Sequence, residues 1–188
     1  MKSMTAPDRI RSLPALRLAA LGKDDRHVLA HAALLGYRFD PATLALALRR
    51  DVETLVGSLQ RARDCDLIVE ERTSPRRFRF QHAIVRASLI DGISPGNALR
   101  LHRKIVRALE ALPDIDSHVD ELAYHAREGR LAVKTFIYSE RAGDAATAVR
   151  ALTDAARYYD WALVAADGPT ARARLRYKIA SLARLGET

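Results

Sequence analysis

The chain has 188 residues, of which 48% are apolar, and a formal net charge of +8 at pH 7. This length and composition allow one sizeable core or two small ones, which excludes a mainly disordered chain. No run of about 18 consecutive apolar residues occurs, and the single cysteine excludes an internal disulfide, so we expect a soluble, cytoplasmic protein held together by packing.

The first third of the chain is predicted to be helical. Apolar residues at helical spacing predict helices over residues 10–21, between Gly22 and Gly36, after Asp40, and from Asp51 to about Asp64. Pro41 supports the predicted start of the third helix. Proline is tolerated at the first helical position because the backbone N–H that it lacks would have no partner there. Asp51 can cap the fourth helix.

A small β-hairpin is predicted next. Residues 67–69 form a short β-prone run, 73–75 have turn chemistry, and 77–80 alternate strictly between Arg and Phe. This alternation places Phe78 and Phe80 on one face of the strand. Helices followed by a hairpin describe a winged helix, and we expect the two rings to seat the hairpin on those helices, because so small a hairpin is not stable alone.

The chain beyond Gln81 is predicted to be entirely helical. The expected helices are 81–91, 94–112, 119–128, 131–152 with Gly143 as a potential break, 153–166 and 170–185. Short loops between such helices predict antiparallel neighbours in a helical bundle or an α-solenoid. The predicted fold is therefore mostly α, with a winged-helix domain over 1–91 and a helical array over 92–188.

The string from Ala155 to Leu163 resembles the second helix of a tetratricopeptide repeat. In that repeat, small residues let two helices approach closely while an aromatic ring fills the gap, which matches the spacing of Ala155, Tyr159 and Ala162. A degenerate copy lies over 132–148. The resemblance implies an antiparallel, tetratricopeptide-like array.

A wider resemblance is carried by three strings in order, at 78–89, 101–110 and 122–125. Together they look like the region after the ATPase core in bacterial signal-transduction ATPases with numerous domains, especially large LuxR-type transcriptional activators and related adenylate cyclases. The resemblance covers about 10–163. It implies a non-enzymatic regulatory module, in which a winged helix couples a nucleotide-binding domain to a helical arm that receives a signal.

The same resemblance implies a protein partner, either a nucleotide-binding domain or a second copy of the chain. An apolar face at the end of a helical array is expected to be covered by one of these. Neither an ATPase domain nor a C-terminal DNA-binding domain is expected within these residues, and no cofactor and no membrane are expected as partners of this chain.

His82 is the candidate cofactor-binding residue that the resemblance singles out. Related ATPases carry a Met-His-Asp motif here, whose imidazole lies near the ADP phosphates, and Gln81-His82-Ala83 keeps only the histidine. This role would require an ATPase domain. The alternative is that His82 packs under the hairpin together with Val85 and Leu89.

No catalytic or metal site is predicted. The sequence has no Gly-x-x-x-x-Gly-Lys-Ser/Thr loop, so we expect no ATP binding by the chain alone. His27 and His31 lack a His-Glu-x-x-His arrangement and are expected on a partly exposed helix face. His102 and His125 fall among core positions, and Cys65 lies between two aspartates, which disfavours a nucleophilic thiolate. An enzyme of another kind would require a deep pocket lined by perturbed titratable groups.

Direct DNA binding is the alternative function. Lys and Arg outnumber Asp and Glu by 16 to 10 over residues 1–90 but only by 15 to 13 over 91–188. Arg72, Arg76 and Arg77 could contact phosphates from the hairpin loop. The helix over 51–64, however, begins with acidic residues and carries no side chain near its start that is placed to read bases. A solvated, edge-protecting hairpin also explains the arginines.

Overall fold

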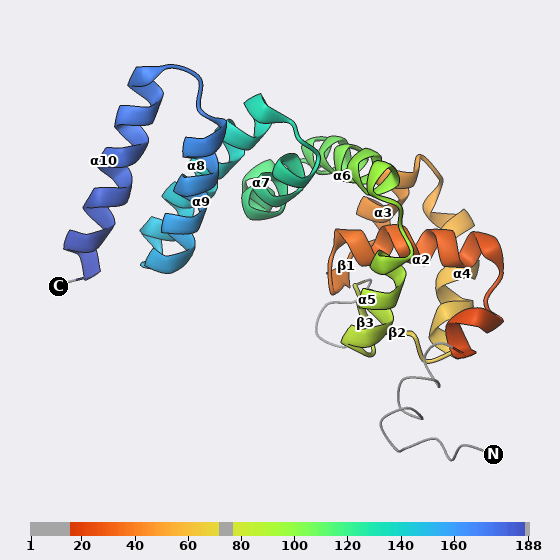
Figure 1. The fold of residues 1–188 in the computed structure, drawn as a ribbon. Helices are drawn as coiled ribbons and strands as arrows, with labels where there is room; N and C mark the ends of the chain where they lie inside the picture. The colour runs from red at the N-terminus through yellow and green to blue at the C-terminus, as the bar shows by residue number, and fades with distance from the viewer. Residues whose placement is uncertain (1–15, 72–76, 187–188) are drawn as a thin grey trace, which may run out of the picture. The chain divides into compact units, whose positions relative to one another are not determined.

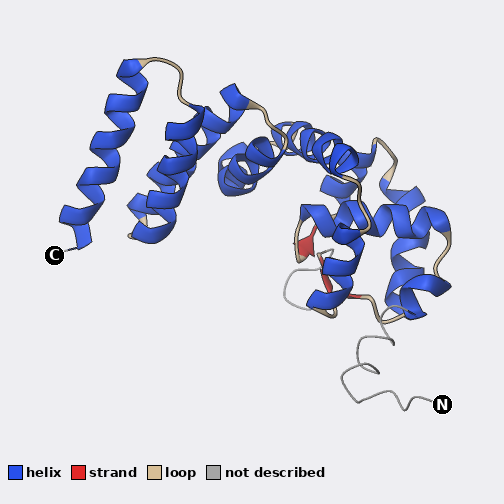
Figure 2. Ribbon diagram, viewed as in Figure 1, coloured by secondary structure: helices blue, strands red, loops and turns tan. Residues whose placement is uncertain are grey.

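The computed structural model describes residues 16–71 and 77–186, and these residues are mostly helical with a small antiparallel sheet (Figure 1, Figure 2). The chain divides into two compact units, Met1–Ala108 (unit 1) and Leu109–Thr188 (unit 2). This division lies near the end of a helix, α6 (Pro95–Glu110). The boundary after residue 91 stays a prediction.

Unit 1 alternates helices and strands in its first part. After helical residues 16–20 come α2 (Lys23–Leu35), β1 (Arg38–Phe39), α3 (Pro41–Leu48), α4 (Val52–Asp64), β2 (Ile68–Glu70), β3 (Phe78–Phe80) and α5 (Ala83–Asp91). Helix α2 packs against α3, α4 and α5, which surround it in Figure 1. The helices expected from periodicity between Gly22 and Asp91 are thereby confirmed.

Two helix starts differ in how they are capped. The Asp40 side chain accepts a hydrogen bond from the Ala42 amide at 2.8 Å, and Pro41 is the first residue of α3, as the sequence indicates. Asp51 is the N-cap residue of α4, as the sequence indicates, but its side chain makes no capping hydrogen bond. Instead, the Thr54 hydroxyl donates to the Asp51 carbonyl oxygen at 2.7 Å.

The sheet has the strand order β1-β3-β2, with both pairings antiparallel. The predicted hairpin is therefore present, and a third strand, β1, pairs with its free edge through the register Phe39 opposite Phe78. The sequence prediction missed β1 because a strand of two residues has no detectable alternation. Its pairing covers an edge that would otherwise present unpaired backbone groups.

Aromatic rings join this sheet to the helices. Phe80 is fully buried in the same core as Leu29 of α2 and Leu55 of α4. The Phe39 ring lies 5.7 Å from the Phe80 ring and 6.0 Å from the Phe78 ring, between centroids. The expectation that Phe78 and Phe80 seat the hairpin on the preceding helices is confirmed.

A buried carboxylate links α2 to α4. Asp25 accepts hydrogen bonds from Arg61 Nε at 2.8 Å and Nη2 at 2.6 Å, and from the Ser58 hydroxyl at 2.7 Å. Its side chain is only 7% exposed. The Arg61 hydrogen bonds hold the pKa of Asp25 below its ordinary value.

Replacing Asp25 with alanine removes the acceptor for Arg61 and leaves the buried Ser58 hydroxyl without this partner. We expect the free energy of unfolding at neutral pH to fall by about 1–3 kcal/mol, measured by urea denaturation with circular dichroism. Because the folded-state pKa of Asp25 is lowered, its stabilisation is present above pH 3.8 and is lost as pH falls through the folded value. The difference between wild type and variant should therefore shrink in acid.

Asp24→Ala is the matched control. Asp24 lies in the same helical turn and bonds Arg50, but its side chain is 63% exposed. Both substitutions remove one favourable charge from the start of α2, so the difference between them isolates the buried network. Equal losses of stability in the two variants would contradict a special role for Asp25.

Unit 2 is a succession of helices. It contains η1 (Ile115–His118), α7 (Val119–Glu128), α8 (Ala132–Ala148), α9 (Leu152–Ala165) and α10 (Pro169–Gly186), and each α-helix packs on the next (Figure 1). Two expectations for α8 are corrected. The helix is not broken at Gly143, and it ends at Ala148 instead of Leu152, just before Arg150 takes a left-handed conformation with φ 58°.

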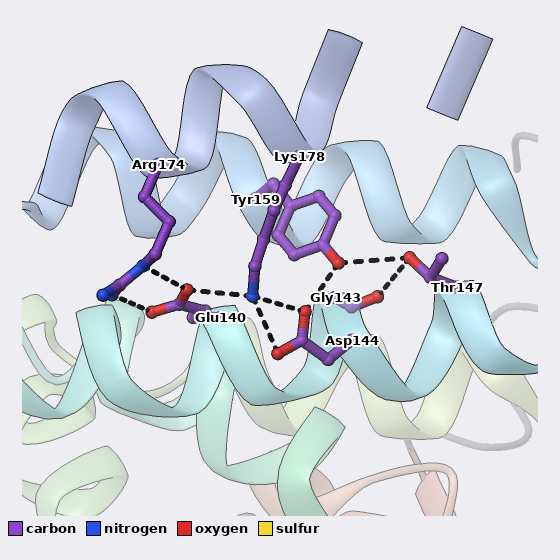
Figure 3. Close-up of polar contacts among 7 residues, drawn as sticks. All are labelled: Glu140, Gly143, Asp144, Thr147, Tyr159, Arg174 and Lys178. Carbon is purple, nitrogen blue, oxygen red and sulfur yellow. Dashed lines mark hydrogen bonds and ion pairs between the residues drawn. The ribbon is translucent and has the colours of Figure 1, made fainter. Parts of the chain in front are cut away.

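Gly143 lets α8 and α9 come together. A Cβ at this position would lie 2.4 Å from a ring carbon of Tyr159, so the aromatic ring occupies the space of the missing side chain. The Tyr159 hydroxyl donates to Asp144 at 2.7 Å (Figure 3). The three residues whose spacing suggested a close helix contact, Ala155, Tyr159 and Ala162, thus lie on the buried face of α9.

Charged pairs join α8 to α10 beside this contact. Glu140 and Asp144 of α8 face Arg174 and Lys178 of α10 (Figure 3). The Glu140 carboxylate accepts two bonds from Arg174, at 2.9 and 2.6 Å, and its side chain is only 14% exposed. Lys178 bridges the two carboxylates, which fixes the position of α10 along α8.

Gly143→Ala should overpack the contact between α8 and α9. We expect a loss of about 1–3 kcal/mol in the free energy of unfolding of unit 2, because the new methyl group displaces the Tyr159 ring. Urea denaturation followed by fluorescence measures this, since the only tryptophan of the chain, Trp161, lies in α9.

Gly96→Ala in α6 is the control. A Cβ at Gly96 meets nothing within 4 Å, so alanine should leave stability unchanged or raise it by up to about 1 kcal/mol through its better helix propensity. Circular dichroism follows this variant. A Gly143→Ala protein as stable as Gly96→Ala would show that the close approach carries no energetic cost.

Candidate interaction surface

Helix α4 is the element that would meet DNA if unit 1 read bases. Asp51 stands at its N-cap and Glu53 in its first turn, which places negative charge where a phosphate would approach. The two arginines of its last turn are engaged within the protein. Arg61 bonds the buried Asp25, and Arg63 lies 3.4 Å from Asp64. The outer face of α4 therefore offers little free positive charge.

An apolar groove of about 430 Å³ runs beside α4 instead. Its apolar lining comes from α3, α4 and the sheet, and consists of Pro41, Ala42, Val52, Val56, Leu59 and Phe78. Val52 and Val56 are 42% and 41% exposed. The remaining lining residues are polar or charged, namely Asp40, Gln60, Arg63 and Glu70. Exposed valines with a polar surround are typical of a surface that binds another protein.

The hairpin arginines are only partly placed. Arg77 is exposed next to the start of β3, whereas Arg72 and Arg76 lie outside the described residues. On β3, Arg79 stands opposite Arg38 of β1, and Arg38 pairs with Glu71 at 2.8 Å. Positive charge is thus present on this side of the sheet, and part of it is neutralised by Glu71.

His82 is exposed and forms the N-cap of α5 without a side-chain capping bond. The interpretation that it packs under the hairpin with Val85 and Leu89 is wrong, because only the latter two are buried. An imidazole on the surface at the start of a helix is accessible to another domain. Its proposed role beside ADP phosphates stays a prediction.

The other histidines divide between core and surface. His102 and His125 are buried, as expected. The expectation of a partly exposed His27 and His31 pair is correct only for His27, because His31 is 2% exposed. Burial lowers the pKa of His31 to about 4. Cys65 is partly buried against the core of unit 1, and within residues 16–71 and 77–186 no three potential metal ligands cluster.

The sequence analysis did not predict the buried Asp25 or the groove. Asp25 lies at helical spacing from the buried Val28, Leu29 and Ala32, and this spacing was a signal that its carboxylate is buried. The groove had no such signal, because exposed valines on α4 become a groove only when α3 and the sheet are placed beside them.

No protein-family model, no curated protein and no solved structure matches the chain. No helix among the described residues is long and apolar enough to cross a membrane.

Proposed function

We propose that the chain is a non-enzymatic regulatory and protein-interaction module, built from a winged helix followed by a tetratricopeptide-like array. In this proposal the winged helix couples a nucleotide-binding domain to the helical arm, as in transcriptional regulators of the signal-transduction ATPase class. The partner is that domain or a second copy of the chain.

The order of elements in unit 1 supports the winged-helix part. Helix α2 is followed by β1, then by α3 and α4, then by the hairpin β2 and β3, with β1 on the free edge of the hairpin. This is the order expected of a helix-turn-helix with an appended sheet. The close contact of Gly143 with Tyr159, between successive helices, supports the tetratricopeptide-like part.

The groove beside α4 is the observation that carries the proposal. The face that would enter DNA presents Val52 and Val56 and begins with Glu53. Removing apolar surface from water favours association with another protein. A charged phosphate backbone does not bury such surface and is instead bound by cations. In the same helix, Arg61 donates two hydrogen bonds to the buried Asp25, so this cation stabilises the fold.

Direct DNA binding is the second candidate, favoured by Arg77 and the arginines of β1 and β3. Anisotropy of a labelled duplex separates the two. We expect only sequence-independent binding, with a Kd of about 10⁻⁴–10⁻⁶ M near physiological salt. An unrelated duplex is the control and should bind equally.

A DNA-reading protein would behave differently. Its binding would be tight and selective for one duplex, and it would fall steeply with salt. Replacing Arg76 and Arg77 together with alanine would then reduce the slope of that salt dependence. This result would establish the second candidate in place of the first.

Val56→Asp tests the groove itself. The valine is exposed, so the variant should fold, but a charge in the groove should abolish association with a protein partner. Sedimentation velocity compares it with wild type and with Val133→Asp, which alters an exposed valine of α8 that does not line the groove. Self-association lost only in Val56→Asp identifies a second copy as the partner. If the wild-type chain stays monomeric, the second copy is excluded, and the nucleotide-binding domain is the remaining partner of the proposal.

A further inference from the structure

A second cavity in unit 1 has the opposite character to the groove. Its volume is about 460 Å³, within the range of small-molecule sites. It lies between α2, the turn after α5 and the first turns of α6, and its lining residues are His27, Ala30, His31, Gly92, Ile93, Asn97, Arg100, Leu101 and Lys104.

The cavity is basic. Arg100 and Lys104 reach it from successive turns of α6, and the Arg100 guanidinium donates to the Asn97 side chain, which also lines it. Among the described residues that line it, none carries a carboxylate, a thiol or a hydroxyl. Two cations without a counter-charge favour an anion, and the lack of a nucleophile or an acid-base pair favours binding over catalysis.

His31 is an unusual lining residue because it is 98% buried and still has an unpaired nitrogen. Its Nδ1 lies 2.8 Å from the His27 carbonyl oxygen, so Nδ1 carries the proton and Nε2 carries a lone pair. Nε2 has no hydrogen-bond partner among the described residues. A buried acceptor left without a donor costs free energy, which a ligand that brings a donor recovers.

Burial is the main reason that the His31 ring stays neutral. It lowers the pKa of His31 to about 4, and the charges of His27 on α2, Lys104 on α6 and Arg50 after α3 act in the same direction. The ring is therefore an acceptor at any pH above that value. A ligand for this cavity must combine negative charge for the two cations with an O–H or N–H group for Nε2.

We propose that the cavity binds a small phosphate group that retains a proton, with Arg100 and Lys104 facing its anionic oxygens and His31 Nε2 accepting its hydroxyl proton. Hydrogen phosphate supplies charge and donor in one group. The phosphate is either inorganic or the monoester of a small molecule, since both share this chemistry.

Isothermal calorimetry with the full chain tests the proposal, at low salt and near pH 6, where a phosphomonoester with a second pKa of about 6 still keeps much of its proton. The probes are inorganic phosphate, glycerol phosphate and sulfate. Sulfate has the same tetrahedral shape and, at this pH, more negative charge, but it has no proton to donate. We expect it to bind roughly tenfold more weakly than phosphate, the effect of one hydrogen bond to a buried acceptor.

Three variants locate the binding. Lys104→Ala and Arg100→Ala should each weaken phosphate binding by roughly tenfold. Arg107→Ala, an exposed arginine one turn beyond Lys104 and outside the lining, should not change it. His31→Phe keeps a ring but removes the acceptor, so phosphate should then lose its advantage over sulfate. Circular dichroism checks that this variant folds, and the sulfate comparison on wild type needs no variant.

Three results would overturn the proposal. They are the absence of phosphate and glycerol phosphate binding, sulfate binding as tight as phosphate, and an Arg107→Ala loss equal to that of Lys104→Ala, which would indicate diffuse charge attraction. The ratio of the two phosphate affinities identifies the source, because tighter binding of glycerol phosphate assigns the cavity to small phosphomonoesters and tighter binding of inorganic phosphate assigns it to the free ion.

Discussion

The contact of three phenylalanine rings supports everything else in unit 1. A sheet with strands of two or three residues has too few hydrogen bonds to persist in water. Phe80 lies in the core between the helices, and Phe39 and Phe78 pack beside it. Because these rings come from β1 and β3, one cluster of apolar contacts holds the sheet together and attaches it to α2 and α4. Phe78 also lines the groove beside α4, so the same cluster contributes to that surface.

The second constraint is electrostatic: a charged side chain that stabilises the fold is not available to bind a partner. Burying Asp25 would be costly without a partner, and Arg61 and Ser58 provide one. The cost is that the last turn of α4 loses a cation it could present to an acidic partner. A basic composition is thus a poor guide to function here, since the net charge of +8 counts Arg61 equally with the exposed Arg77.

Periodicity predicted the helices well because each needs only local spacing and a start signal, as Asp40-Pro41 shows for α3. It could not find β1, whose two residues become a strand only through their pairing with β3. It also misplaced the exposure of His31 and of His82, because each depends on what packs across from its helix. Site residues were hardest to predict for the same reason, because the groove and the basic cavity each combine segments distant in sequence.

The basic cavity gains importance from the helix that forms one of its walls. Helix α6 contributes Arg100 and Lys104 to the cavity, while its last residue, Glu110, belongs to unit 2 and accepts bonds from Lys134 at 2.6 Å and from the Tyr138 hydroxyl at 2.7 Å. In our proposal an anion in the cavity is bound by α6 together with α2, both within unit 1. By linkage, a change that moves the start of α6 relative to α2 would therefore change the affinity for that anion.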